Sequence, residues 1–220
     1  MSSWNDLRIS IAASFVLAQE GTANAVLITN QPDNKKIDIA SYIQAEKEEF
    51  ILFSVTCEDQ YSYSPYYPFL DIIKNRAKGK QSKIVKKLGI YPCFQDLFIS
   101  YCFSDSEVPE FGKDPPIFEE REWNKQKMLE SICNAITKLY CENTLIFQLN
   151  AFEKAPESTV DLVKHILNRW GNCKIMFVLT QSEKSNIKSS LITPEFENNR
   201  SGIRKRLVVF EASENDDFLD

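Results

Sequence analysis

A lysine that follows a buried strand and a polar loop is the feature of this chain best suited to binding a phosphate. The strand is residues 25–29, and the loop after it reads NQPDNKKI over residues 30–37. The phosphate-binding pattern at such a place is G-x-x-x-x-G-K-[ST], in which the lysine reaches the phosphates and the hydroxyl binds Mg²⁺. Lys36 occupies the lysine position of that pattern.

The other functional positions of the pattern are altered. Asn30 and Asn34 replace its glycines, and Ile37 replaces its Ser or Thr. Glycine allows positive φ and a close backbone approach, whereas asparagine tolerates that conformation but adds a side chain. Ile37 offers no oxygen to a metal ion. The sequence therefore predicts a degenerate phosphate loop with weak cofactor-binding residues: Asn30, Asn34, Lys35 and Lys36.

Apolar segments rich in Val, Ile, Leu and Phe predict the strands that would position this loop. Such nearly continuous runs are typical of parallel strands that are covered on both faces. The predicted strands are Ala25–Thr29, Phe50–Val55, Thr144–Leu149, Lys174–Thr180 and Arg206–Phe210.

Helical spacing of apolar residues separates these strands. It predicts helices over Ile37–Lys47, Trp123–Tyr140 and Pro156–Trp170, and an amphipathic first helix around Ile9–Ala18. The alternative for that first segment is a short signal-peptide core, but its flank lacks net positive charge. Alternating strands and helices predict an α/β three-layer sandwich with a mainly parallel five-stranded sheet.

The long gap between the second and third strands predicts a helical and loop insertion at about residues 65–121. We expect short helices at Pro65–Arg76, Ile84–Gly89 and Phe94–Phe103, and an acidic surface loop at 104–116. The remainder predicts a single domain over residues 1–213. The acidic tail, 214–220, is typical of a chain that continues into a longer protein.

Four stretches, taken in order, carry a family pattern. They are VLITNQPDNKKIDIASYI, CEDQYSYSPYYPFLDII with its Pro-Tyr-x-Pro-Phe at Pro65–Phe69, NTLIFQLNAFEKAPESTVDLVKHIL, and KIMFVLTQSEK. Together they resemble the signal-transduction (STAND) branch of the AAA-like ATPases, found in bacterial transcription regulators and nucleotide-cyclase proteins. The resemblance implies an ASCE-type P-loop NTPase sheet that binds ATP and Mg²⁺.

The same resemblance places carboxylates after the third strand, where they hold Mg²⁺ and activate water. Asn150 and Ala151 occupy these positions, and Glu153 follows close by. Asn150 and Glu153 are thus only weak metal candidates, and Gln181 stands where a polar or basic sensor is expected. We predict no catalytic residue and no metal site. We expect a catalytically inactive ATPase-like module with a regulatory, scaffolding or protein-interaction role, whose partner is a protein or a covalently linked output domain.

Two alternatives stay open. One is an ATP-binding signalling switch with an atypical phosphate loop, which would need ATP and Mg²⁺. The other is a nucleic-acid-associated module that uses the basic run at 74–87, although a net charge of -5 and a pI near 5.2 argue against nucleic acid.

The composition predicts a cytoplasmic protein. Its 6 cysteines form no C-x-x-C pair and its 1 histidine stands apart, so no zinc pattern is present. Cysteines of this kind are typical of reduced thiols. No apolar run approaches the ~18 residues that a membrane span requires, so we expect no membrane partner.

Overall fold

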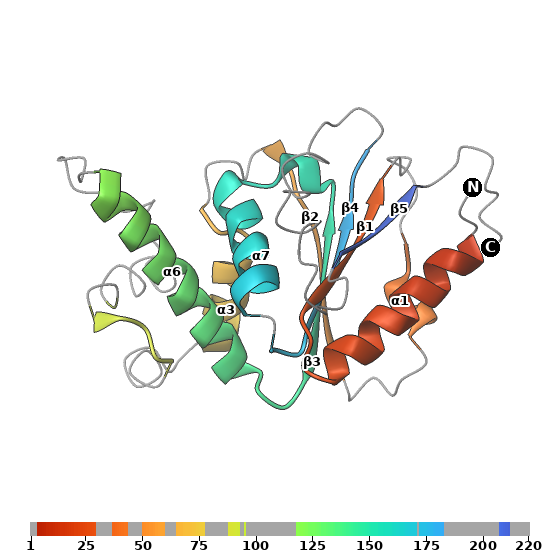
Figure 1. Cartoon of the computed structure of the whole chain (residues 1–220), viewed down its shortest axis with the longest axis horizontal. Helices are drawn as coiled ribbons and strands as arrows, with labels where there is room; N and C mark the ends of the chain where they lie inside the picture. The colour runs from red at the N-terminus through yellow and green to blue at the C-terminus, as the bar shows by residue number, and fades with distance from the viewer. Residues whose placement is uncertain are drawn as a thin grey trace, which may run out of the picture. The chain divides into compact units, whose positions relative to one another are not determined.

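The computed structural model describes residues 4–29, 37–43, 50–59, 65–77, 88–92, 95, 118–170, 172–182 and 207–211. Its elements, in chain order, are α1 (Trp4–Gln19), β1 (Asn24–Thr29), α2 (Ile39–Tyr42), β2 (Phe50–Thr56), α3 (Phe69–Ala77), α6 (Phe118–Leu139), β3 (Thr144–Asn150), the short 3-10 helix η3 (Phe152–Lys154), α7 (Glu157–Arg169), β4 (Ile175–Thr180) and β5 (Leu207–Glu211) (Figure 1).

The chain divides into two compact units. Unit 1 consists of Met1–Ser62, Glu142–Ala155 and Val163–Asp220, and unit 2 consists of Tyr63–Cys141 and Pro156–Leu162. The first half of α7 therefore belongs to unit 2 and the second half to unit 1. The single domain over 1–213 and the tail at 214–220 stay predictions.

Unit 1 contains a five-stranded sheet in the order β2-β3-β4-β1-β5, and all four strand pairs are parallel. The predicted α/β fold is therefore confirmed, and each of the five predicted strands is present within one or two residues of its expected bounds. The strand order is consistent with a P-loop-type or a Rossmann-type sheet.

Helix α1 covers one face of this sheet. Its side chains Leu7, Ile11 and Phe15 form a buried core with Val26 and Ile28 of β1, because alternate strand residues point to the same face. Residues 163–169 of α7 lie on the opposite side of the sheet (Figure 1). On that face of the sheet, Phe53, Phe147 and Phe177 form a row of stacked rings. The ring centroids of Phe53 and Phe147 are 5.3 Å apart, and those of Phe147 and Phe177 are 5.5 Å apart.

Helix α2 is much shorter than predicted. Asp38 accepts a hydrogen bond from the Ala40 backbone N–H at its start, and Ile43 is already extended, with φ −96° and ψ 109°. The prediction of a helix over Ile37–Lys47 was wrong at Ile43. The backbone of Ile43 is extended, and its side chain is buried in the core that α1 forms with the sheet. Residues 44–49 lie outside the described part of the chain.

In unit 2, the helix predicted from Pro65 begins only at Phe69. Residues 65–68 form a turn in which Tyr66 has φ 58°. A residue before proline disfavours the helical region, and Pro68 therefore delays the helix start. Of the predicted helix Ile84–Gly89, the described residues Leu88 and Gly89 form a turn.

The rest of the predicted insertion can be compared only in part. Phe94–Phe103 lies outside the described residues apart from Gln95, and the acidic loop lies wholly outside them. Helix α6 begins at Phe118, earlier than the predicted start at residue 123. Within the described parts of the chain, no helix combines the length and the hydropathy that a membrane crossing demands.

Candidate functional site

The topology of the unit 1 sheet defines where a ligand site is expected. The connection after β1 leads to β2 at the far edge, whereas the connection after β4 passes β1 and leads to β5. Right-handed crossovers in opposite directions lie on opposite faces of a sheet. Ligands of open α/β sheets bind beyond the carboxyl ends of neighbouring strands whose connections diverge in this way. The candidate site is therefore the carboxyl edge at β1, β4 and the adjoining β3.

Of the predicted phosphate loop, only the last position is described. Asn30, Asn34, Lys35 and Lys36 lie outside the described residues, so they stay a prediction. The Ile37 side chain is 4% exposed and belongs to the core that α1 forms with the sheet. This position, which would carry the metal-binding hydroxyl, has become part of the hydrophobic packing.

A network of neutral side chains occupies the end of β3. The Gln148 Nε2 amide donates hydrogen bonds to the Ile37 carbonyl at 3.0 Å and to Asn150 Oδ1 at 3.3 Å. The Thr180 hydroxyl, at the end of β4, donates to the same Asn150 oxygen at 3.4 Å. It also accepts from the Ala151 backbone N–H at 3.3 Å. The network thus joins β3, β4 and the segment before α2.

This network occupies the side-chain oxygen of Asn150, which a metal ion would need as a ligand. An amide oxygen has two lone pairs, and both accept a hydrogen bond here. Coordination of Mg²⁺ by Asn150 would break both bonds and leave the buried Gln148 amide with one acceptor. Together with the apolar Ile37, this arrangement does not fit the Mg²⁺ that the resemblance implies.

The chain turns sharply after Asn150. Ala151 is left-handed, with φ 50° and ψ 48°, and precedes the 3-10 helix that carries Glu153. The next residue, Phe152, is fully buried and anchors this turn. A left-handed alanine costs conformational energy, which the packing of Phe152 and the hydrogen bond to Thr180 offset.

Glu153 lies at the same sheet edge but has partners of its own. Its Oε1 accepts a hydrogen bond from the Ser182 hydroxyl at 2.9 Å, and its buried Oε2 has no hydrogen-bond partner in the described structure. Burial, followed by the negative charge of Glu153, raises the pKa of the Cys57 thiol to about 12. Glu153 therefore lies near the ends of β2 and β4 without joining the Asn150 network.

Among the described residues, no group of three or more His, Cys, Asp or Glu side chains is placed to bind a metal ion. The predicted sensor residue Gln181 is 3% exposed, and its backbone N–H donates to the Ile28 carbonyl of β1 at 2.9 Å. The preceding residue, Thr180, provides the side chain that contacts Asn150.

Sequence reasoning missed Gln148, Thr180 and Cys57 as organising residues of this edge. The sequence held a signal for Gln148, because this polar residue interrupts the apolar strand TLIFQLN. In the structure its side chain is buried. A buried polar side chain within a strand requires hydrogen-bond partners, which predicts a network without naming its members.

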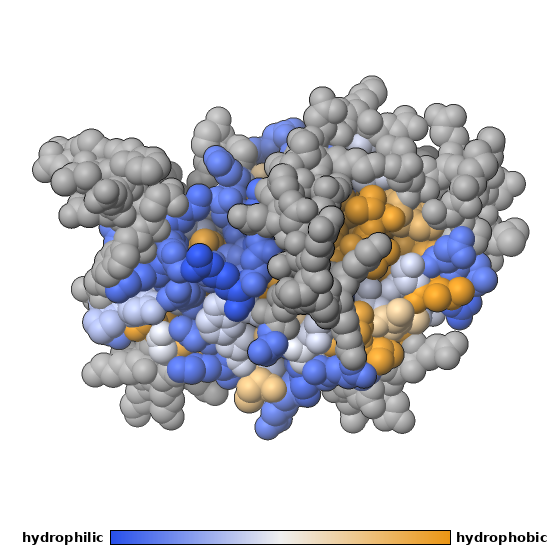
Figure 2. Space-filling view, viewed as in Figure 1, coloured by the Kyte–Doolittle hydropathy of each residue, from blue (hydrophilic) through white to orange (hydrophobic). Residues whose placement is uncertain are grey.

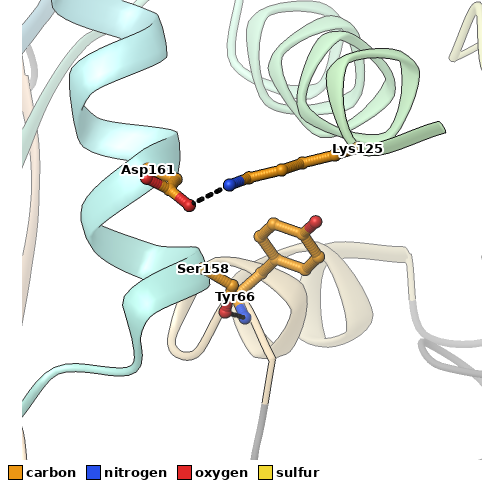
Figure 3. Close-up of polar contacts among 4 residues, drawn as sticks. All are labelled: Tyr66, Lys125, Ser158 and Asp161. Atoms are coloured by element: carbon orange, nitrogen blue, oxygen red, sulfur yellow. Dashed lines mark hydrogen bonds and ion pairs between the residues drawn. The ribbon is translucent and has the colours of Figure 1, made fainter. Parts of the chain in front are cut away.

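Unit 2 has a second polar cluster, which holds the turn at residues 65–68, here called the aromatic turn. The Ser158 hydroxyl accepts a hydrogen bond from the Tyr66 backbone N–H at 2.9 Å, and the Thr159 hydroxyl donates to the Tyr67 carbonyl at 2.6 Å. Figure 3 shows the Tyr66 ring beside the Lys125 side chain. The first turn of α7 thus fixes the Pro-Tyr-x-Pro-Phe segment.

An ion pair accompanies this cluster. Lys125 Nζ of α6 lies 2.6 Å from Asp161 Oδ2 of α7, and their side chains are 40% and 22% exposed (Figure 3). The aromatic side chains of the Pro65–Phe69 segment contribute to packing, since Phe69 is fully buried and Tyr66 and Tyr67 are half-buried.

The basic run is described only at its start. The Arg76 guanidinium lies over the Tyr140 ring, 5.5 Å from its centroid, and Lys74 is half-buried on α3. Residues 78–87 lie outside the described part of the chain. Arg76 therefore contributes a cation–π contact within unit 2.

No protein-family model matches this chain, and comparison with curated proteins finds no match. The proposals below rest on the residues, the sheet topology and the site geometry.

Proposed function

We propose that this chain is a P-loop-like α/β domain that has lost catalysis and acts as a regulatory, scaffolding or protein-interaction module of a signalling protein. The single observation that carries the proposal is the occupied Asn150 oxygen. Gln148 and Thr180 both donate to it, in the position where a catalytic carboxylate would hold Mg²⁺.

The physical reasoning compares two uses of the same sheet edge. A nucleotide-hydrolysing site needs an oxygen that can exchange its partners for a metal ion and a water molecule. Here the neutral network joins neighbouring strands, and its donors are buried side chains at or near the strand ends. Such a network holds the edge in one conformation and leaves the Asn150 oxygen no free lone pair for a metal ion.

The proposal places the module in the cytoplasm, with a protein partner or a linked output domain. The structure describes Cys57, Cys133, Cys141 and Cys173 and joins none of them in a disulfide. That state fits a reducing compartment.

A calorimetric titration of the 220-residue chain with ATP and Mg²⁺ tests the proposal. We expect no binding heat and no shift in melting temperature at millimolar ATP, because both lone pairs of the Asn150 oxygen are used and the Glu153 carboxylate lies outside that network. Micromolar binding that Lys36→Ala abolishes would contradict the proposal and establish the alternative, an ATP-binding switch with an atypical phosphate loop.

An Asn150→Asp variant provides a matched control for that titration. The substitution keeps the shape of the side chain and the oxygen to which Gln148 and Thr180 donate, and it adds the negative charge of a carboxylate. Mg²⁺-dependent ATP binding by Asn150→Asp, together with none by the natural chain, would identify residue 150 as the position at which binding was lost.

A further inference from the structure

We draw no further inference here: the strongest candidate, the apolar patch that Ile9 and Val16 expose on the outer face of α1 (Figure 2), carries no proposal because nothing in the structure shows what covers it.

Discussion

The carboxyl edge of the unit 1 sheet and the aromatic turn of unit 2 are both held by side-chain hydrogen bonds, but they use these bonds differently. At the carboxyl edge, the Gln148 and Thr180 side chains donate to the Asn150 side chain, and they also bond to the backbone of Ile37 and Ala151. At the aromatic turn, the Ser158 and Thr159 hydroxyls bond to the backbone of residues 66 and 67.

The kind of hydrogen bond determines whether a substitution changes only the side-chain chemistry or also the fold of the backbone. Side chains that bond to one another can be exchanged without altering the fold of the backbone. Hydroxyls that bond to the backbone of a left-handed residue, as Ser158 does at Tyr66 and Thr180 does at Ala151, hold the course of the chain itself. Position 150, whose side-chain oxygen accepts from two other side chains, is therefore the place at which a substitution can change the chemistry of the edge while the fold persists.

The largest expected difference between the two units concerns thiol reactivity. Burial, and then Glu153, raises the pKa of Cys57 to about 12, so only about one molecule in ten thousand carries the thiolate near pH 8. Cys57 is therefore expected to react with iodoacetamide at least about a hundredfold more slowly than the exposed Cys141 of unit 2. Mass spectrometry of a labelling time course measures both rates.

The raised pKa of Cys57 also predicts how stability depends on pH. The unfolded thiol ionises near its ordinary value of 9.0, whereas the folded thiol stays protonated to about 12. The free energy of unfolding must then fall as pH rises from about 9 to about 12, because the folded state binds the extra proton. A Cys57→Ala variant is expected to flatten that slope in urea titrations, and an unchanged slope would contradict it.

Truncating Phe69, the residue directly after the aromatic turn, is expected to have the largest effect on the free energy of unfolding. Phe69→Ala leaves a cavity in place of a fully buried ring, which costs about 3–5 kcal/mol. Urea unfolding monitored by circular dichroism measures this loss. The matched control is Asp71→Ala on the same helix, which is exposed and is expected to change stability by less than about 0.5 kcal/mol.

Breaking the neutral network is expected to have a smaller effect. Gln148→Ala removes the donor to the Ile37 carbonyl and to Asn150, and leaving such buried acceptors unpaired costs about 1–3 kcal/mol. The free energy of unfolding, again from urea titration, checks the value. Asn150→Asp keeps both donors engaged, so it should be tolerated better than Gln148→Ala; the reverse order would show that the network does not stabilise the edge.

The smallest expected effects separate the two kinds of contact in unit 2. Ser158→Ala removes a hydrogen bond to the Tyr66 backbone and should cost about 0.5–1.5 kcal/mol. Lys125→Ala removes the ion pair with the partly exposed Asp161 and should cost less than about 1 kcal/mol, an amount that decreases with added salt. A greater loss from Lys125→Ala than from Ser158→Ala would mean that the ion pair, not the hydroxyl, holds this region.

Much of the fold could be predicted from the sequence, because buried parallel strands require continuous apolar runs. All five predicted strands are present, and the predicted helix over 156–170 matches α7, Glu157–Arg169. The prediction failed at α2 and at Pro65–Phe69, where Ile43 packs into the α1 core and Pro68 delays the helix start. Local spacing cannot predict the first effect, since it depends on residues distant in sequence, whereas the second could have been read from Pro68 itself.

For the candidate site, the sequence alone showed only which residues depart from the phosphate-loop pattern. Asn30, Asn34, Ile37, Asn150 and Ala151 differ in residue type from the glycines, hydroxyl and acids that the resemblance implies at those positions. The partners of Asn150 could not be predicted, because Thr180 lies 30 residues away and reaches it only through the pairing of β3 with β4.

The amino-acid sequence by itself determined the alternation of strands and helices and the absence of a carboxylate at positions 150 and 151, since residue type and local spacing suffice for both. The tertiary structure decided the strand order, the occupied Asn150 oxygen, the raised pKa of Cys57 and the exposure of Ile9 and Val16. The physical reason is that hydrogen bonding, desolvation and burial depend on which distant segments become neighbours, and only the folded chain specifies them.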